Sequence, residues 1–182
     1  MDWNDTFMEL FHDAVERYHG NSHVNPLQFF YPSELEFLTS IGYKAQEMFD
    51  YIADYAQTGQ PSPSTTLLIA SKRRTYFFTA QRAMNSTSKP TSLSDLPSPE
   101  DDFGGYVYMP HIIGKAEAKL RGTLDDGIMY SNARDRQFFE ENGGISPADF
   151  LGMVNNVRGD RQKLITAIIH TIEQLKKRQQ EP

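Results

Sequence analysis

The chain has 182 residues, a net charge of −6, no cysteine and 38% hydrophobic residues. This length and composition predict one globular domain over residues 1–182, and the lack of cysteine excludes disulfides, thiolate metal sites and cysteine nucleophiles. A pI near 5.3 argues against nucleic-acid binding, and no apolar run approaches the roughly 20 residues that a membrane-spanning helix needs.

The N-terminal third of the chain predicts amphipathic helices. Its first residues, MDWNDTFMELF, are acidic and do not resemble a signal peptide, so we expect a cytoplasmic protein. Apolar residues recur at three- and four-residue spacing from Trp3 to Tyr18, and again over residues 44–57. Between these helices, Ser33 and Glu36 have the spacing of a capping box at the start of a short helix.

Residues 65–83 contain a pair of arginines among large aromatic residues. The apolar run 65–70 is compatible with a strand, but nineteen residues without glycine or proline favour a helix. Arginine beside aromatic rings often binds planar anions, so Arg73 and Arg74 are candidate ligand-binding residues. Alternatively, they pair with carboxylates of residues 1–62, which carry ten acids and two bases. Adjacent helical side chains point about 100° apart, so at most one arginine should face inward.

Residues 84–105 are rich in serine and proline and predict the longest irregular stretch of the chain. Loops of this length and acidic composition are functional lids or flexible connectors, and we favour the connector.

The segment 110–122, PHIIGKAEAKLRG, predicts a helix with a cationic side. At about 100° per residue, His111, Lys115 and Lys119 share one sector, and Ile113, Ala116 and Leu120 lie opposite. We expect a cationic stripe on the outer face of this helix, with Arg121 near its end. The stripe is either a solvated face or a site for a carboxylate or phosphate.

The turn after this helix, TLDDGIMY, offers carboxylates and a phenol. Asp125 and Asp126 are weak candidates for an acid and a base, and Tyr130 is a weak candidate for a proton donor. A DDG sequence is also an ordinary turn, which explains the same residues without catalysis.

The C-terminal third predicts three further helices with clear start signals. Asn132, Ser146 followed by Pro147, and Asp160 are typical N-terminal caps. The last helix carries a stripe of leucine and isoleucine from Leu164 to Leu175. Together the patterns predict an all-α, or predominantly α, protein: an irregular compact bundle of about six to eight helices.

Three segments together resemble a known bacterial family. MPH at 109–111 with KAEAKLRGTL at 115–124, LLIASKRRTYFF at 67–78 and SPADFL at 146–151 are similar to the family called domain of unknown function 5069. The resemblance implies a small, mainly helical, cytoplasmic bacterial protein, and it brings no established activity. Where that family commonly has arginine after the proline, this chain has His111.

The sequence is compatible with two functions. One is a non-catalytic module that binds an anionic small molecule or an acidic partner through the cationic helix, with Arg73 or Arg74. The alternative is a small enzyme on phosphate or carboxylate substrates, in which an aspartate and Tyr130 act as acid and base while Lys115 and Lys119 hold the substrate. The chain has no zinc-type ligand spacing, since His19 and His23 flank a glycine, and no nucleotide-binding motif, so we expect neither metal nor cofactor.

Overall fold

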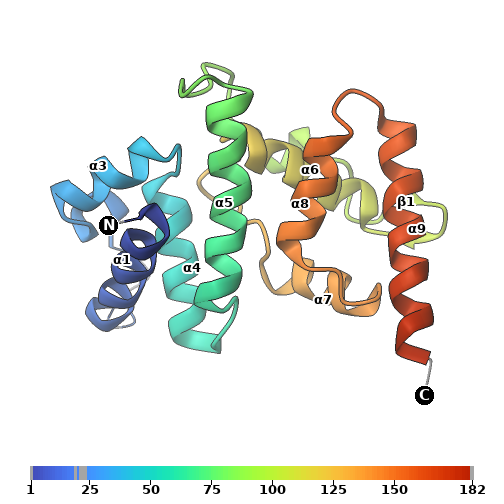
Figure 1. Ribbon diagram of the computed structural model, residues 1–182, viewed down its shortest axis with the longest axis horizontal. Coiled ribbons are helices and arrows are strands. Elements are labelled where there is room, and N and C mark those ends of the chain that lie inside the picture. Colours follow the sequence, from blue (N-terminus) through green and yellow to red (C-terminus); the bar gives the residue numbers. More distant parts are fainter. Residues whose placement is uncertain (1, 19, 21–23, 181–182) are drawn as a thin grey trace. The chain divides into compact units, whose positions relative to one another are not determined.

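The structure is predominantly helical, as the sequence predicts. This computed structural model describes residues 2–18, 20 and 24–180, which leaves His19 and His23 outside the described residues. Nine α-helices and one two-stranded sheet lie in the described part (Figure 1). Apart from the four-residue helix α2, the described helices number eight, which is within the expected six to eight.

The chain divides into two compact units, residues 1–87 and residues 88–182. The boundary falls inside the predicted connector, and the single domain over residues 1–182 stays a prediction.

The first unit contains five helices: α1 (Trp3–Arg17), α2 (Pro26–Phe29), α3 (Pro32–Ser40), α4 (Ala45–Thr58) and α5 (Pro63–Thr79). Helix α1 packs against α4 and α5, and α2 packs against α4. The apolar stripe of α1 is buried through Phe7, Leu10 and Phe11, as its spacing predicts.

Two local predictions in this unit have different outcomes. Residues 65–70 are helical, because Ser62 caps α5 with a hydrogen bond from Thr65 N and the helix starts at Pro63. The capping box at Ser33 and Glu36 is wrong: α3 starts earlier, at Pro32, and Glu34 accepts the hydrogen bond from Tyr31 N at 2.8 Å.

The second unit contains four helices, one turn of 3₁₀ helix and a hairpin: η1 (Leu93–Asp95), β1 (Asp102–Phe103), β2 (Tyr106–Val107), α6 (Met109–Arg121), α7 (Ala133–Glu141), α8 (Pro147–Asn156) and α9 (Arg161–Gln180). Asn132, Ser146 and Asp160 each accept a hydrogen bond from a backbone N–H three residues later, so these predicted caps are confirmed.

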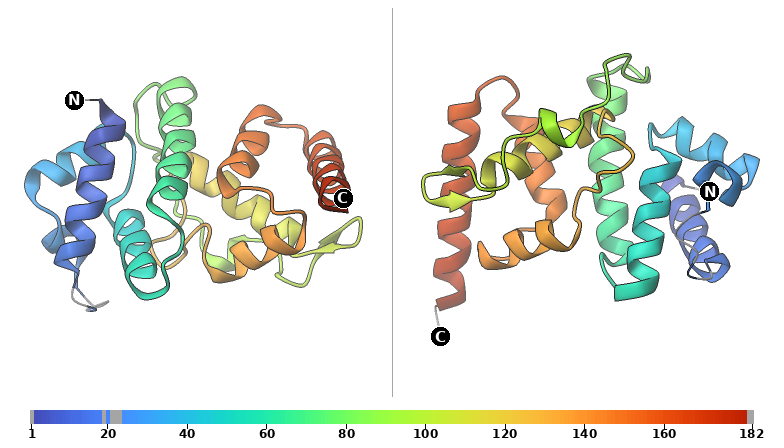
Figure 2. Two further views of the ribbon diagram at one scale, coloured as in Figure 1. Left: turned by 60° about the horizontal axis from the view of Figure 1, so that its bottom comes forward. Right: turned by 180° about the vertical axis from the view of Figure 1, so that it is seen from behind.

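Helix α6 lies at the centre of the packing in the second unit. It packs against α8 and β1, and α8 packs in turn against α9. The hairpin lies beside α9 in the views of Figures 1 and 2, and a side chain at Gly104 would meet Ile169 of α9. Eleven of the thirteen residues of α6 are therefore buried.

The segment 84–105 is more ordered than the predicted loop. Thr91 N donates to Thr123 O at 2.6 Å and Asp125 N donates to Thr91 O at 3.0 Å, so the segment is tied to the turn after α6. Leu96 is buried, and the residues from Leu93 onward include η1 and β1. From residue 88 onward the segment thus forms part of the second unit, and it packs on one side of α6.

Among the described helices, none combines the length and the apolar character that crossing a membrane requires.

Candidate functional site

The cationic stripe predicted on α6 faces the interior, so its expected outward orientation is wrong. Lys115 and Lys119 are each 1% exposed and His111 is 6% exposed. The spacing of the three residues on one side of the helix is as predicted, but neighbouring elements cover that side as well as the apolar side. This side of α6 is covered because the helix lies in the middle of the packed unit, so the cationic residues on it have no access to solvent.

Lys115 forms an ion pair with Asp135, a buried carboxylate at the start of α7. Its Nζ lies 2.5 Å from Asp135 Oδ2, and Asp135 is 0% exposed. The same carboxylate accepts hydrogen bonds from Tyr108 Oη at 2.7 Å and from Ser131 N at 2.7 Å. Burial lowers the pKa of Lys115, and Asp135 opposes that shift. This network joins the start of α6, the middle of α6 and the start of α7.

His111 is also held by contacts within the protein. Its Nδ1 lies 2.8 Å from Pro97 O, and its ring lies 4.9 Å from the Tyr108 ring, between centroids. Burial and the charge of Asp135 raise the pKa of Tyr108. His111 therefore connects the segment before the hairpin to the buried network.

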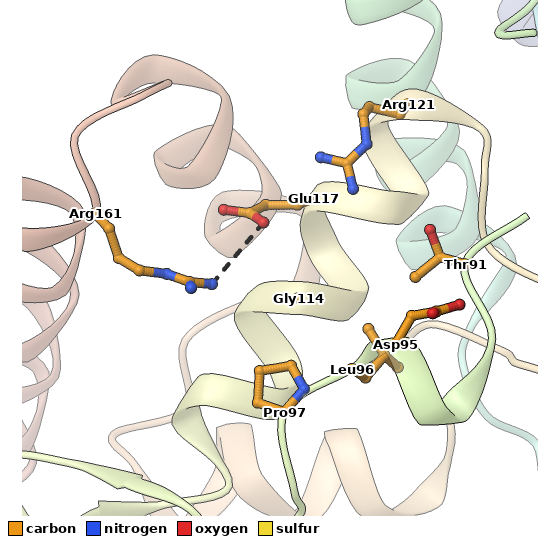
Figure 3. A pocket seen from close by; sticks show the side chains of 8 residues that line it. All are labelled: Thr91, Asp95, Leu96, Pro97, Gly114, Glu117, Arg121 and Arg161. Atoms are coloured by element: carbon orange, nitrogen blue, oxygen red, sulfur yellow. Dashed lines mark ion pairs between the residues drawn. The ribbon is translucent and has the colours of Figure 1, made fainter. Parts of the chain in front are cut away.

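The accessible face of α6 is a different one, and it carries Arg121. Gly114, Glu117 and Arg121 follow each other at three- and four-residue spacing and so share one face of the helix. With Thr91, Leu96 and Pro97 they line a pocket of about 440 Å³. This volume lies within the roughly 300–1,000 Å³ of small-molecule sites. Figure 3 shows the guanidinium group of Arg121 directed into this pocket.

Arg161, the first residue of α9, adds a second guanidinium group to this pocket. Its Nη2 lies 4.0 Å from Glu117 Oε2, and in Figure 3 the Glu117 carboxylate lies between the two arginines. Both members of this pair are partly exposed, so the pair contributes little to stability. Because Arg121 lies on the other side of Glu117, this carboxylate has a guanidinium group on each side.

A glycine makes this pocket by allowing a close approach. A Cβ at Gly114 would lie 3.1 Å from Leu96 Cδ2 and 3.1 Å from Pro97 Cδ. The segment 91–97 can therefore lie close to α6 at the floor of the pocket. Asp95 also lines the pocket, and hydrogen bonds from Ser92 lower the pKa of its carboxyl.

Sequence reasoning found Arg121 but missed Arg161 and Glu117. The glycine in the interior of an otherwise helical pattern was the available signal, because such a glycine often marks a close backbone approach. No local pattern relates Arg161 to α6, since forty residues separate it from Arg121 and only the packing of α8 and α9 brings them to one pocket.

The three candidate catalytic residues have structural contacts. Tyr130 is 1% exposed and its Oη donates to Pro147 O at 2.9 Å. Asp125 Oδ1 accepts a hydrogen bond from Gly127 N at 3.2 Å, which is an ordinary turn contact. Asp126 is exposed. Lys115 is held by Asp135 instead.

Arg73 and Arg74 belong to the first unit, and they differ in burial as predicted. Arg73 is 1% exposed and its Nη1 donates to Gln81 Oε1 at 2.6 Å. Burial lowers its pKa, and the nearby carboxylate of Glu47 opposes this shift. Arg74 is half-buried, and its guanidinium carbon lies 4.8 Å from the centres of both the Trp3 and Phe78 rings. These contacts favour the structural alternative, and a ligand-binding role for either arginine stays a prediction.

Within the described ranges, no group of three or more histidine, aspartate or glutamate side chains is arranged to hold a metal ion. No family model, curated protein or solved structure matches this chain. The resemblance to the family of unknown function 5069 therefore stays a prediction.

Proposed function

We propose that the protein is a non-catalytic binding module, and that the pocket on α6 binds a small carboxylate or phosphate through Arg121 and Arg161, beside the carboxylate of Glu117. The observation that carries this proposal is the placement of two guanidinium groups, one from α6 and one from α9, in one pocket of about 440 Å³. Guanidinium groups bind planar anions through paired N–H donors, and both arginines can supply such donors to one pocket.

The charge of the pocket sets the class of anion. Its charged residues are Arg121, Arg161, Glu117 and Asp95, which sum to no net charge. Such a pocket suits an anion of low charge, and a small carboxylate suits it better than a highly charged phosphate ester. The contacts of Asp125 and Tyr130 with the backbone support binding over catalysis. A cytoplasmic bacterial setting remains part of this proposal, on the sequence grounds given above.

A thermal-shift experiment with acetate, succinate and inorganic phosphate tests the proposal. A ligand at a hundred times its dissociation constant adds about 2.7 kcal/mol, which is a rise of several degrees. We expect this rise for wild type and for Lys163→Gln, which removes a neighbouring exposed cation of α9 outside the pocket. We expect it to be lost in Arg121→Gln and in Arg161→Gln.

The variant Glu117→Gln gives the charge test. It removes the negative charge between the two arginines, so the affinity for inorganic phosphate should rise several-fold. Stabilisation of Arg121→Gln equal to that of wild type would contradict the proposal.

A further inference from the structure

A second pocket of the same unit combines aromatic rings with cations. It has a volume of about 540 Å³ and lies between the hairpin, the start of α6, α7 and α9. Three aromatic residues line it: Tyr106, Tyr108 and Phe138. It shares none of its lining residues with the Arg121 pocket.

Two cations of the second pocket are held beside these rings. The guanidinium carbon of Arg134 lies 4.7 Å from the centre of the Tyr108 ring, and Lys176 Nζ lies 5.4 Å from the centre of the Tyr106 ring. Lys176 also donates to Asn142 Oδ1 at 3.2 Å, while the Asn142 amide donates to Phe138 O at 2.8 Å. Lys176 is thus positioned by a side chain that is itself fixed to the backbone of α7.

The remaining polar residues complete a site for a small planar molecule. Gln137 and Asn142 supply amide groups, and Glu141 is the one acid among the pocket's lining residues. The two cations and one acid leave a net positive charge of one on the lining, and Arg134 also pairs with the carboxylate of Glu100 at 3.4 Å. Both members of that pair are exposed, so the acid group of a ligand can replace Glu100 at little cost.

The hydroxyl of Tyr108 is already donated to buried Asp135, so only the ring of this residue lines the pocket. The rings of Tyr108 and Phe138 are nearly buried, and Tyr106 is the most exposed of the three.

We propose that this second pocket binds an aromatic acid, with the ring of the ligand packed among Tyr106, Tyr108 and Phe138 and its acid group between Arg134 and Lys176. Aromatic rings gain from offset or edge contacts with one another, and a carboxylate or phosphate satisfies the cations. Aliphatic acids of the same charge lack the ring contacts and bind more weakly.

The experiment follows backbone amide resonances of Gly105 and Gln137, on two sides of the pocket, during titration with benzoate and phenyl phosphate. Cyclohexanecarboxylate serves as the matched acid without an aromatic ring. We expect saturable shifts at both residues with the aromatic acids, and at least tenfold weaker binding of cyclohexanecarboxylate.

Three variants locate the binding. Arg134→Gln changes an exposed side chain, so it should retain the fold while weakening benzoate at least tenfold. Lys177→Gln, which changes the next residue of α9 outside the pocket, should leave the affinity unaltered. Arg121→Gln should also leave it unaltered, which separates this site from the proposed function.

Equal affinities of Arg134→Gln and wild type would overturn the inference, as would shifts that never saturate. Equal binding of benzoate and cyclohexanecarboxylate would overturn its aromatic part.

Discussion

At the residue scale, the charge of Lys115 suggested a solvent-exposed side chain, but the residue is buried. A lysine on an amphipathic helix usually keeps its ammonium group in water. Here the ammonium pairs with buried Asp135, and the same carboxylate accepts hydrogen bonds from Tyr108 Oη and Ser131 N. The sequence contains both charges, but twenty residues separate them and nothing local indicates that they meet.

We predict that Lys115→Met lowers the free energy of unfolding by about 3–5 kcal/mol, because it leaves the Asp135 charge buried without its partner. Chemical denaturation would measure the loss. The control Lys163→Met changes an exposed lysine and should alter stability by less than about 0.5 kcal/mol. A loss in Lys115→Met as small as in the control would mean that the pair does not form.

We also predict that the stabilising effect of the Tyr108 hydroxyl disappears at alkaline pH. Burial and Asp135 raise the pKa of Tyr108 above its ordinary value of 10.0. The folded state therefore keeps a proton that the unfolded state loses above about pH 10, and stability falls as pH rises.

Urea unfolding of wild type and Tyr108→Phe between about pH 8 and pH 11 measures this effect. The variant should be less stable below about pH 10, and the difference should then shrink by about 1.4 kcal/mol per pH unit. The lowered pKa of Lys115 acts in the opposite direction, but this lysine is present in both proteins. A difference that stays constant up to about pH 11 would contradict the assigned hydrogen bond.

At the element scale, local sequence signals predict most of the helices, but they do not predict which faces of these helices are buried. Asn132, Ser146 and Asp160 start their helices where the sequence predicts, because each cap satisfies an N–H group of the first turn. The start of α3 was misplaced because Glu34 and Glu36 both resemble the acid of a capping box, and the backbone selects Glu34. Which faces of α6 are covered depends on α8 and the segment 84–105, and helical periodicity carries no information on that.

The end of α3 gives a prediction at this scale. Gly42 has a positive φ of +72°, and a Cβ there would lie 2.6 Å from Cδ2 of Phe77 on α5. Gly42→Ala should therefore combine backbone strain with a steric clash and destabilise the protein by about 2 kcal/mol or more.

Gly59→Ala is the matched control for Gly42→Ala. Gly59 has nearly the same φ, +73°, but a Cβ there meets nothing within 4 Å. It should show only the cost of the left-handed backbone, about 1 kcal/mol. Thermal or chemical denaturation of both variants separates the two contributions, and equal losses would contradict the close approach of Phe77 to Gly42.

At the scale of the whole molecule, the helical class was predictable from the sequence, and the residues of the candidate binding site were predictable only in part. Composition, capping and periodicity are properties of short segments, and they suffice for a predominantly helical chain. The pocket of Arg121 joins α6, the segment 91–97 and the first residue of α9. Such a site depends on contacts between distant parts of the chain, so Arg121 was identified as a candidate while Arg161 was not.

The most direct measurement for the proposed function is to follow the side-chain Nε–H resonances of the arginines during titration with succinate and inorganic phosphate. If the pocket of Arg121 and Arg161 binds a small anion, both of these resonances shift together and saturate at one concentration, while that of exposed Arg158 does not. Uniform, unsaturable shifts of all exposed arginines would contradict the proposed binding function.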